Sequence, residues 1–404
     1  MKTQAPPAGL SRRALGAWAV GGGAAMVAGL PVAAQTPPPP PEPTRLKSAG
    51  ETLRPEIVGD FGIVAAGRHY AVAAGTRILM AGGNATDAGV AAVFAAAVTE
   101  ISHFGFGGEA PTIIYDSGTK DVTVINGQGT APALATPDKF AQLGMIPGNG
   151  PMGGTIPAMV DAMARALQLN GTMTLDQVMQ PAIELADGFV MYNFLAEVFV
   201  SQQKATAKYK TAYDTYYPGG ALPRVGDIFR QPNLARTMRT IAAADKAAFT
   251  RTKDRNAAIQ AGRDAFYKGD IARTIGAAME ADGGLMRYAD LAAYQGKVEA
   301  PLTTDVFGYT VCKGGFWSQG PALLIALNIA EAAGIPVSSH LFPEFSSHLL
   351  AATPTAHWLE FTDWAAPLMA TPVEVEDGHI QISSTPGAGV EWNEEAVEKY
   401  AVTL

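Results

Sequence analysis

The sequence predicts an α/β protein, because short β-rich runs alternate with apolar helical segments through most of the chain. Three observations near its front carry this prediction. Residues 70–81 show a helical apolar period and stop at two glycines, which cap a helix at little conformational cost. Residues 88–98 carry no charge and predict a buried helix. Residues 112–115 and 122–125 are β-rich runs joined by DSGTKD, which indicates a hairpin.

Local signals place the elements in order. Asn84 is a suitable N-cap for the second helix, and Asp87 lies three positions on, near the positive end of the helix dipole. This helix is shorter than the ~20 apolar residues that a bilayer requires. Residues 202–217 are polar and rich in tyrosine, which indicates a surface helix or loop. Apolar patterning predicts further helices at residues 174–187, 270–282 and 322–334.

Composition excludes several classes of function. The formal net charge is −8 and charged residues make up 16% of the 404-residue chain, so binding to nucleic acid has little electrostatic support. The single cysteine, Cys312, excludes an intrachain disulfide, and we expect a packed residue after a strand. Glycines 105, 107 and 108 lack the Gly-Lys-Ser/Thr that completes a phosphate loop, which favours a tight turn. We expect no cofactor and no metal, since the spacing of His340, His348 and His357 fits no compact zinc pattern.

The first 58 residues have the composition of an export signal and a linker. Arg12 and Arg13 precede an uncharged run, and small residues at 32–34 suit cleavage before Gln35, as in a twin-arginine signal. An uncleaved membrane anchor is the alternative, which the glycines and proline within the run disfavour. Residues 36–58 begin with TPPPPPEPT and form a stiff proline-rich linker. We therefore predict a signal at residues 1–35, a periplasmic or secreted protein, and no stable membrane anchor.

The motifs GGNATDA, FGFGGEAPTIIYDSGTKDVTVINGQGTAPALATPD, GTMTLDQVMQPAIELADGF and PLTTDVFGYTV follow one another in order. Together they resemble the large-subunit part of the gamma-glutamyltranspeptidase family over residues 59–327. The resemblance implies a domain at 59–330 with part of the αββα sandwich of N-terminal nucleophile hydrolases. It also implies amide hydrolysis or acyl transfer on a small-molecule amide or gamma-glutamyl substrate.

The same resemblance ends before the threonine that serves this family as nucleophile at the start of its small subunit, so we expect a missing small subunit and an inactive isolated chain. The pair Thr303-Thr304 lies in a motif that matches a large-subunit strand instead. Gln128 stands where the family carries an arginine that pairs with the substrate α-carboxylate. A neutral amide cannot form that bidentate ion pair, so Gln128 is a candidate substrate-binding residue for another amide, or a polar loop residue.

The tail carries a different set of motifs, SSHLFPEF and HWLEFTDWA, followed by EVEDGHIQ. These resemble the C-terminal end of mandelate racemase in the enolase superfamily, over residues 334–404, and predict a fragment of a (β/α) barrel end at 331–404. The resemblance gives His340 the role of general base and Glu360 that of an acid hydrogen-bonded to the substrate carboxylate. The carboxylate strands that would hold the metal of that mechanism are absent from the sequence.

Three functional hypotheses remain open from the sequence. The chain takes part in gamma-glutamyltransferase-type amide chemistry, it acts as a racemase or dehydratase on hydroxy acids, or it is a non-catalytic fusion of two enzyme fragments. Whether this chain alone is an enzyme is undecided at this stage.

Overall fold

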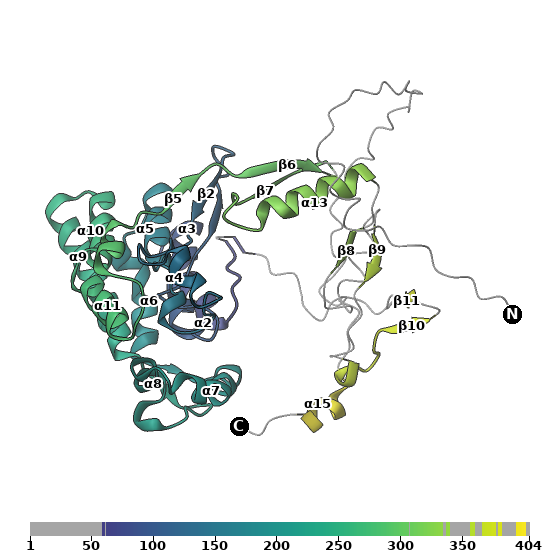
Figure 1. Ribbon diagram of the computed structural model, residues 1–404. Helices are drawn as coiled ribbons and strands as arrows, with labels where there is room; N and C mark the ends of the chain where they lie inside the picture. The colour runs from purple at the N-terminus through teal and green to yellow at the C-terminus, as the bar shows by residue number, and fades with distance from the viewer. Residues whose placement is uncertain are drawn as a thin grey trace. The chain divides into compact units, whose positions relative to one another are not determined.

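The computed structural model describes residues 59–60, 62–306, 308–333, 337–339, 356–359, 366–376, 379–381 and 393–400 (Figure 1). All of them belong to the unit of residues 46–404. The predicted signal, the whole predicted linker, His340 and Glu360 lie outside the described residues. Among the residues that the structure describes, no helix is long and apolar enough to cross a membrane.

The first two helices form as the sequence predicts. Helix α2 (His69–Met80) packs against α3 (Ala85–Thr99), and Asn84 and Asp87 form a reciprocal capping box at the start of α3. Gly75 lets the two helices approach, because a β-carbon there would lie 3.0 Å from the carbonyl oxygen of Ala88. Most side chains of α3 are buried, as expected for an uncharged helix.

The predicted hairpin forms two strands of a three-stranded antiparallel sheet, and its second strand lies in the middle. Strand β1 (Thr112–Tyr115) pairs with β2 (Val122–Asn126), with Thr112 opposite Ile125. Strand β5 (Lys297–Glu299), from much later in the chain, pairs with the other edge of β2. The prediction of a tight turn before β1 is confirmed, because the amide of Gly108 donates to the carbonyl of Gly105 at 2.8 Å.

A layer of helices forms the core around α3. Helices α5 (Met159–Asn170) and α6 (Leu175–Asp187) both contact α3, α9 (Pro232–Thr252) packs on α6, and α10 (Arg255–Tyr267) packs on α9 and α5 (Figure 1). The predicted helix at 174–187 thus forms, with Thr174 as its N-cap. Apolar side chains from all five helices make one continuous core, which fixes the loops that follow the sheet.

The remaining elements of the front part are short helices and a two-stranded sheet. They are α4 (Pro137–Ala141), η1 (Pro151–Gly153), β3 (Phe189–Val190), α7 (Asn193–Thr206), α8 (Lys210–Tyr216), η2 (Pro218–Gly220), β4 (Ile228–Phe229), α11 (Asp270–Ala281) and α12 (Tyr288–Ala293). The predicted helix at 270–282 is confirmed as α11. The tyrosine-rich stretch forms helix rather than loop, and the hydroxyl of Tyr217 is buried and donates to the carbonyl of Phe199.

A second hairpin and a helix follow the sheet. Strand β6 (Leu302–Val306) pairs antiparallel with β7 (Tyr309–Lys313), and α13 (Gly320–Ala333) packs on both strands. Cys312 lies within β7 rather than after a strand, and it is half-buried. Beyond α13 the described residues form β8 (Val337–Ser339), β9 (Ala356–Leu359), η3 (Ala366–Leu368), β10 (Glu374–Glu376), β11 (His379–Gln381) and α15 (Glu394–Tyr400).

The described residues contain mixed helix and strand, but their largest sheet has three strands. Only part of the αββα sandwich was expected, and the described residues contain one three-stranded sheet with helices packed beside it, while the predicted fragment of a (β/α) barrel end is not confirmed. Strands β8 and β9 run parallel, and β10 and β11 form an antiparallel pair.

Candidate functional site

Gln128 lies in a loop whose backbone is fixed on every side. The backbone amide of Gln128 donates to the side-chain oxygen of Asn126 at 3.1 Å, and the backbone carbonyl of Gln128 accepts from the hydroxyl of Tyr294 at 2.9 Å. The glycines on either side lie against other segments. A β-carbon at Gly127 would be 2.0 Å from the carbonyl oxygen of Ala110, and one at Gly129 would be 2.0 Å from a carbonyl oxygen of the segment before α5. This close approach requires glycine at both positions.

Gln128 lines a cavity of about 1060 Å³, which we call the Gln128 cavity. The described lining residues come from β1, β2 and the segment that joins β7 to α13: Pro111, Thr112, Ile113, Val124, Gln128, Lys313, Gly314, Trp317, Ser318, Gln319, Gly320, Ala322 and Leu323. Within the described part of the chain no hydrogen bond engages the Gln128 side-chain amide. It can therefore donate to and accept from a ligand.

A buried charged network lies behind this loop. The Asp161 carboxylate is fully buried in the first turn of α5 and accepts from the guanidinium groups of Arg165, at 2.6 Å, and Arg263. It also accepts from the amide of Gly296 at 3.0 Å. Arg263 in turn donates to the carbonyl of Tyr294, whose hydroxyl holds Gln128. The network thus connects the interior of the helical layer to the backbone of the candidate site.

Burial sets the pKa of the Tyr294 hydroxyl. Removal from water, reinforced by the negative charge of Asp161, raises the pKa of the Tyr294 hydroxyl to about 12. The hydroxyl therefore stays protonated at any physiological pH and remains a hydrogen-bond donor to Gln128. The ring of Tyr294 stacks on that of Tyr267, with ring centroids 5.6 Å apart, which further limits its movement.

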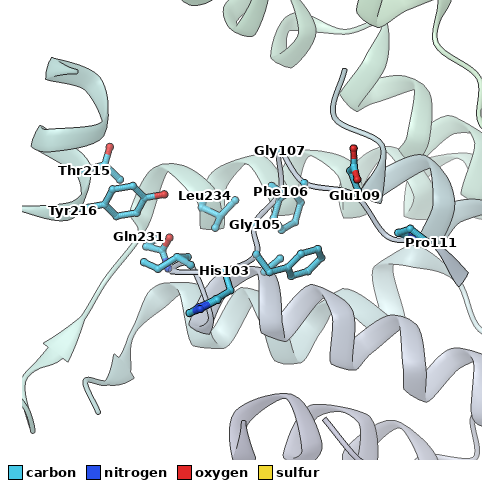
Figure 2. Close-up of a pocket in the computed structure, with 14 residues that line it drawn as sticks. His103, Gly105, Phe106, Gly107, Glu109, Pro111, Thr215, Tyr216, Gln231 and Leu234 are labelled. Carbon is cyan, nitrogen blue, oxygen red and sulfur yellow. The ribbon is translucent and has the colours of Figure 1, made fainter. Parts of the chain in front are cut away.

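A second pocket, of about 780 Å³, lies beside the glycine-rich loop between α3 and β1 (Figure 2). His103 and Glu109 both line it, but in Figure 2 the His103 ring and the Glu109 carboxylate lie apart. The hydroxyl of Thr215 donates to the carbonyl of Thr211 at 2.8 Å, and the Gln231 amide to that of Val98 at 2.7 Å. Since Thr215 and Gln231 have these local partners and the His103 ring lies apart from the Glu109 carboxylate, the described residues of this pocket show no nucleophile paired with a base, as acyl transfer needs.

The same loop is not a phosphate site. The carbonyl of Gly108 accepts from the amides of Ala158 and Met159, each at 3.1 Å, so the loop presents an acceptor to the start of α5. Phosphate binding requires amide donors pointing at the ligand. The described residues also contain no cluster of three or more His, Cys, Asp or Glu side chains that could hold a metal ion.

The structure separates the candidate residues named from sequence. Gln128 faces a cavity, whereas His340 and Glu360 lie outside the described residues. Thr303 and Thr304 lie within β6, and the Thr304 hydroxyl donates to the side chain of Asn328 at 2.7 Å. A strand position with this local partner agrees with the interpretation that the pair is not a nucleophile.

Sequence reasoning missed Lys313 and Trp317, which line the same cavity as Gln128. The run KGGFWSQG that contains them is a glycine-rich connection between a strand and a helix. Such connections often form the wall of a binding site, and this signal was available in the sequence.

Comparison with known proteins defines the class to which this fold belongs. In the crystal structure of gamma-glutamyltranspeptidase from Helicobacter pylori the matched part is 27% identical, with a TM-score of 0.62, and covers 69% of this chain and 77% of that one. The profile of the family described as gamma-glutamyltranspeptidase matches residues 71–359. The chain therefore belongs to the gamma-glutamyltranspeptidase family. The match extends past residue 327, where the sequence resemblance was expected to end.

Two relatives show the range of this family. A glutathione hydrolase proenzyme of Bacillus subtilis is 34% identical over 277 residues, which are 67% of this chain and 44% of that protein. An acylase proenzyme of a Pseudomonas species is 31% identical over 265 residues, 63% of this chain and 44% of that protein. The chain thus spans less than half the length of these two relatives.

An enolase from Bradyrhizobium, complexed with magnesium and mandelic acid, is 48% identical over 21% of this chain, with a TM-score of 0.18. The barrel fragment predicted for residues 331–404 therefore stays a prediction.

Proposed function

We propose that this chain supplies the substrate-binding part of an amide hydrolase or acyl transferase, and that Gln128 contacts the acyl group of the substrate. The observation that carries the proposal is that Gln128 lines a cavity while its backbone is fixed by Tyr294 and Asn126 and its side chain has no hydrogen-bond partner among the described residues. Family membership and the acylase and glutathione hydrolase relatives support the reaction class. A rigid backbone with an available side chain is what substrate positioning needs.

The proposed substrate differs from a simple gamma-glutamyl compound. In the family that the sequence resembles, an arginine at the position of Gln128 pairs with a carboxylate of the substrate. A glutamine cannot reproduce that charged pair. A glutamine amide instead offers one donor and one acceptor side, which suit a carbonyl or amide group of the ligand. The proposed site therefore selects an acyl amide that presents a neutral polar group to Gln128.

The proposal assigns the nucleophile to a small-subunit-like part, as the family resemblance implies. The described threonines at positions 303 and 304 belong to a hairpin, and an N-terminal threonine with its own amine remains the expected nucleophile and base. This assignment makes acyl transfer dependent on a partner segment, whereas substrate binding needs only the described residues of the cavity.

Binding is thus the direct test. Titration calorimetry with the full chain should detect a simple acyl anilide, and Gln128→Ala should weaken that binding by about tenfold, through loss of a hydrogen bond of ~1 to 1.5 kcal/mol. Gln142→Ala is the matched control, because Gln142 is an exposed residue that follows α4. Equal affinity of both variants for the anilide would contradict the role of Gln128. No binding by the unmodified chain would contradict the proposed function itself.

Catalysis is the second test. Coexpression with the remaining part of the Bacillus subtilis glutathione hydrolase should produce anilide hydrolysis that neither part shows alone. A folded complex that binds the anilide and releases no aniline would argue against the assignment of the nucleophile to a small subunit.

A second candidate function concerns the tail, as part of a racemase or dehydratase that is joined to the family domain. Its support is the parallel pairing of β8 with β9, since parallel neighbours are the unit of a (β/α) barrel. His340 directly follows β8 and Glu360 directly follows β9 in the sequence, so the proposed base and acid would come from adjacent strand ends. The matched family region also includes both strands, and the described residues contain no cluster that could hold the metal of a racemase.

The test is exchange of the α-proton of mandelate into deuterated water, with Mg²⁺ added. Exchange that His340→Ala abolishes would support the racemase-like function. Absence of exchange in a folded, monodisperse chain would favour a non-catalytic fusion. Sequencing of the source DNA across codons 317–345 would show whether the two parts are joined in one reading frame.

Export is proposed for the N-terminal segment, on the strength of Arg12, Arg13 and the uncharged run that follows them. N-terminal sequencing of protein recovered from the periplasm should begin near residue 35. Retention in the cytoplasm with an intact first residue would contradict export.

A further inference from the structure

Two oppositely charged residues line a small pocket beside the starts of α2 and α7 and the end of α3. Its volume is about 300 Å³, and it shares no described lining residue with the Gln128 cavity. Arg68 lies at the N-cap of α2 and Glu100 at the C-cap of α3. We call this space the Glu100 pocket. Its other described lining residues are Gly67, Ser102, His103, Tyr192 and Phe194.

The guanidinium group of Arg68 is held over two aromatic rings of the pocket wall. Its central carbon lies 4.7 Å from the ring centroid of Phe194 and 5.3 Å from that of Tyr192. The Tyr192 ring is itself anchored, because its hydroxyl donates to the carbonyl of Thr99 at 3.0 Å. A guanidinium has five N–H donors in one plane, so stacking on rings leaves donors at its edge for a ligand. No carboxylate in the described part of the chain pairs with Arg68.

The carboxylate of Glu100 also lacks a counter-ion. Its Oε1 atom is enclosed and accepts no hydrogen bond from the described residues. Its Oε2 atom lies against the backbone of Gly67, since a β-carbon at that glycine would be 2.4 Å from it. No basic side chain among the described residues forms an ion pair with Glu100. Withdrawal of a carboxylate from water without a donor is costly, so a cation that carries N–H groups would be bound favourably here.

Arg68 and Glu100 do not neutralise each other. They form no ion pair, although both charges act on one hydroxyl of the pocket. Burial raises the pKa of the Tyr192 hydroxyl, the positive charge of Arg68 opposes this rise, and the negative charge of Glu100 adds to it. The helix dipoles favour the same separation of charge, because the positive end of α2 lies at Arg68 and the negative end of α3 at Glu100. The pocket therefore has a positive side and a negative side.

A ligand that matches this pocket carries both charges itself. An anion would be attracted by Arg68 and repelled by Glu100, and for a simple cation the two effects are reversed. A zwitterion satisfies both side chains, with its acid group on the guanidinium and its ammonium group on the carboxylate. The volume of about 300 Å³ restricts the ligand to a small molecule. Because the two side chains are too far apart to pair, charges at the two ends of a short chain suit the site better than charges on neighbouring atoms.

We propose that the Glu100 pocket binds a short ω-amino acid, with Arg68 holding the acid group of the ligand and Glu100 holding its ammonium group. The ligand is bound without a covalent step. Since the pocket shares no described lining residue with the Gln128 cavity, the inference goes beyond the proposed function and does not depend on it.

The test is titration calorimetry of the full chain with 4-aminobutyrate and three matched probes. Butyrate lacks the ammonium group, propylamine lacks the carboxylate, and 2-aminobutyrate carries both charges close together. The unmodified chain should bind 4-aminobutyrate about tenfold more tightly than any of the three, as expected for one hydrogen bond between charged groups. The preference should shrink at high ionic strength.

Glu100→Gln should remove the preference over butyrate, and Arg68→Met should remove the preference over propylamine. Gly67→Ala keeps both charges but displaces the Oε2 atom of Glu100, so it should also weaken binding of 4-aminobutyrate. The matched controls are Glu280→Gln, at an exposed position of α11, and Arg251→Met, at an exposed position of α9. Both controls should bind 4-aminobutyrate as the unmodified chain does.

The preference over butyrate preserved in folded Glu100→Gln, or that over propylamine preserved in folded Arg68→Met, would overturn the assignment. Equal binding of 4-aminobutyrate and butyrate by the unmodified chain would reject the zwitterionic ligand, and this comparison requires no variant to fold. Tighter binding of 2-aminobutyrate would reject the ω-amino acid. Absence of binding would reject the site, while anilide binding in the Gln128 cavity would be unaffected.

Discussion

Replacement of Asp161 by asparagine tests the charged network behind the candidate site. The substitution preserves the size of a fully buried side chain and removes its charge. One oxygen of the carboxylate accepts from Arg165 at 2.6 Å and from the amide of Gly296 at 3.0 Å, and the other accepts from Arg263. An asparagine retains only one acceptor oxygen, so at least one of these donors loses its partner.

The magnitude follows from the burial of the groups left behind. Removal of one partner from a buried ion pair costs about 3–5 kcal/mol. The Arg263 side chain is 4% exposed, but it keeps Asp264 at 3.1 Å and the carbonyl of Tyr294 as acceptors, which reduces the loss. We therefore expect Asp161→Asn to lower the free energy of unfolding by about 3 kcal/mol, which is roughly a 150-fold change in the folding equilibrium.

The assay is urea unfolding of the full chain, followed by far-ultraviolet circular dichroism. Asp264→Asn is the matched control, because this carboxylate also contacts Arg263 but is one-third exposed, and its loss should cost at most about 1 kcal/mol. Anilide affinity provides a second measurement, since Asp161→Asn should also loosen Tyr294 and with it the Gln128 loop. The reasoning is refuted if the two variants lose the same stability.

Three further substitutions probe the rest of the fold. Gly129→Ala should destabilise by about 1–3 kcal/mol in urea unfolding, because its β-carbon would lie 2.0 Å from the carbonyl oxygen of Ile156. Asp87→Asn should cost about 3 kcal/mol by the same assay, since the carboxylate accepts from the loop at 172–173 as well as from the α3 cap. Asp245→Asn should stabilise the chain at neutral pH. Burial raises the pKa of the Asp245 carboxyl, so its contribution to stability is present below its ordinary pKa and lost as pH rises through the raised one.

Each of these three predictions has its own control. Gly105→Ala should change stability by less than about 0.5 kcal/mol, because its β-carbon would meet no atom within 4 Å. Asp138→Asn removes an exposed acid from the first turn of α4 and should cost about 0.5 kcal/mol. For the pH prediction, the stability gain of the amide variant should shrink as the solution is acidified from the raised pKa of Asp245 towards about pH 4, the ordinary pKa of an aspartate, and should change no further below it. A gain that does not vary with pH would contradict burial of the charged form as its cause.

Local elements could be predicted from sequence because their signals act over a few residues. The capping box at Asn84, the hairpin turn and the glycine stop after α2 depend on side chains and backbone within one or two turns. Helices α6 and α11 followed from the apolar period. The family was correctly predicted from ordered motifs, whereas the αββα sandwich is only partly represented in the described residues.

The candidate site could be predicted only in part. Gln128 was found because a family motif marked its position, but Lys313, which lines the same cavity, was missed although it begins the glycine-rich run KGGFWSQG. His340 and Glu360 stay predictions, since they lie outside the described residues. The second acceptor role of Asp87, toward Thr172, was also invisible, because the two residues are 85 positions apart.

The sequence by itself determined where α2, α3, α6 and α11 form and that residues 88–98 lie in a buried helix. Those properties depend on capping, turn geometry and apolar periodicity, all of which act along the chain. Only the tertiary structure decided that Asp161 pairs with Arg263, 102 residues away, and that Tyr294 holds the Gln128 loop. Such contacts require helices and strands from distant parts of the chain to pack first, and no local signal specifies which buried partners then meet.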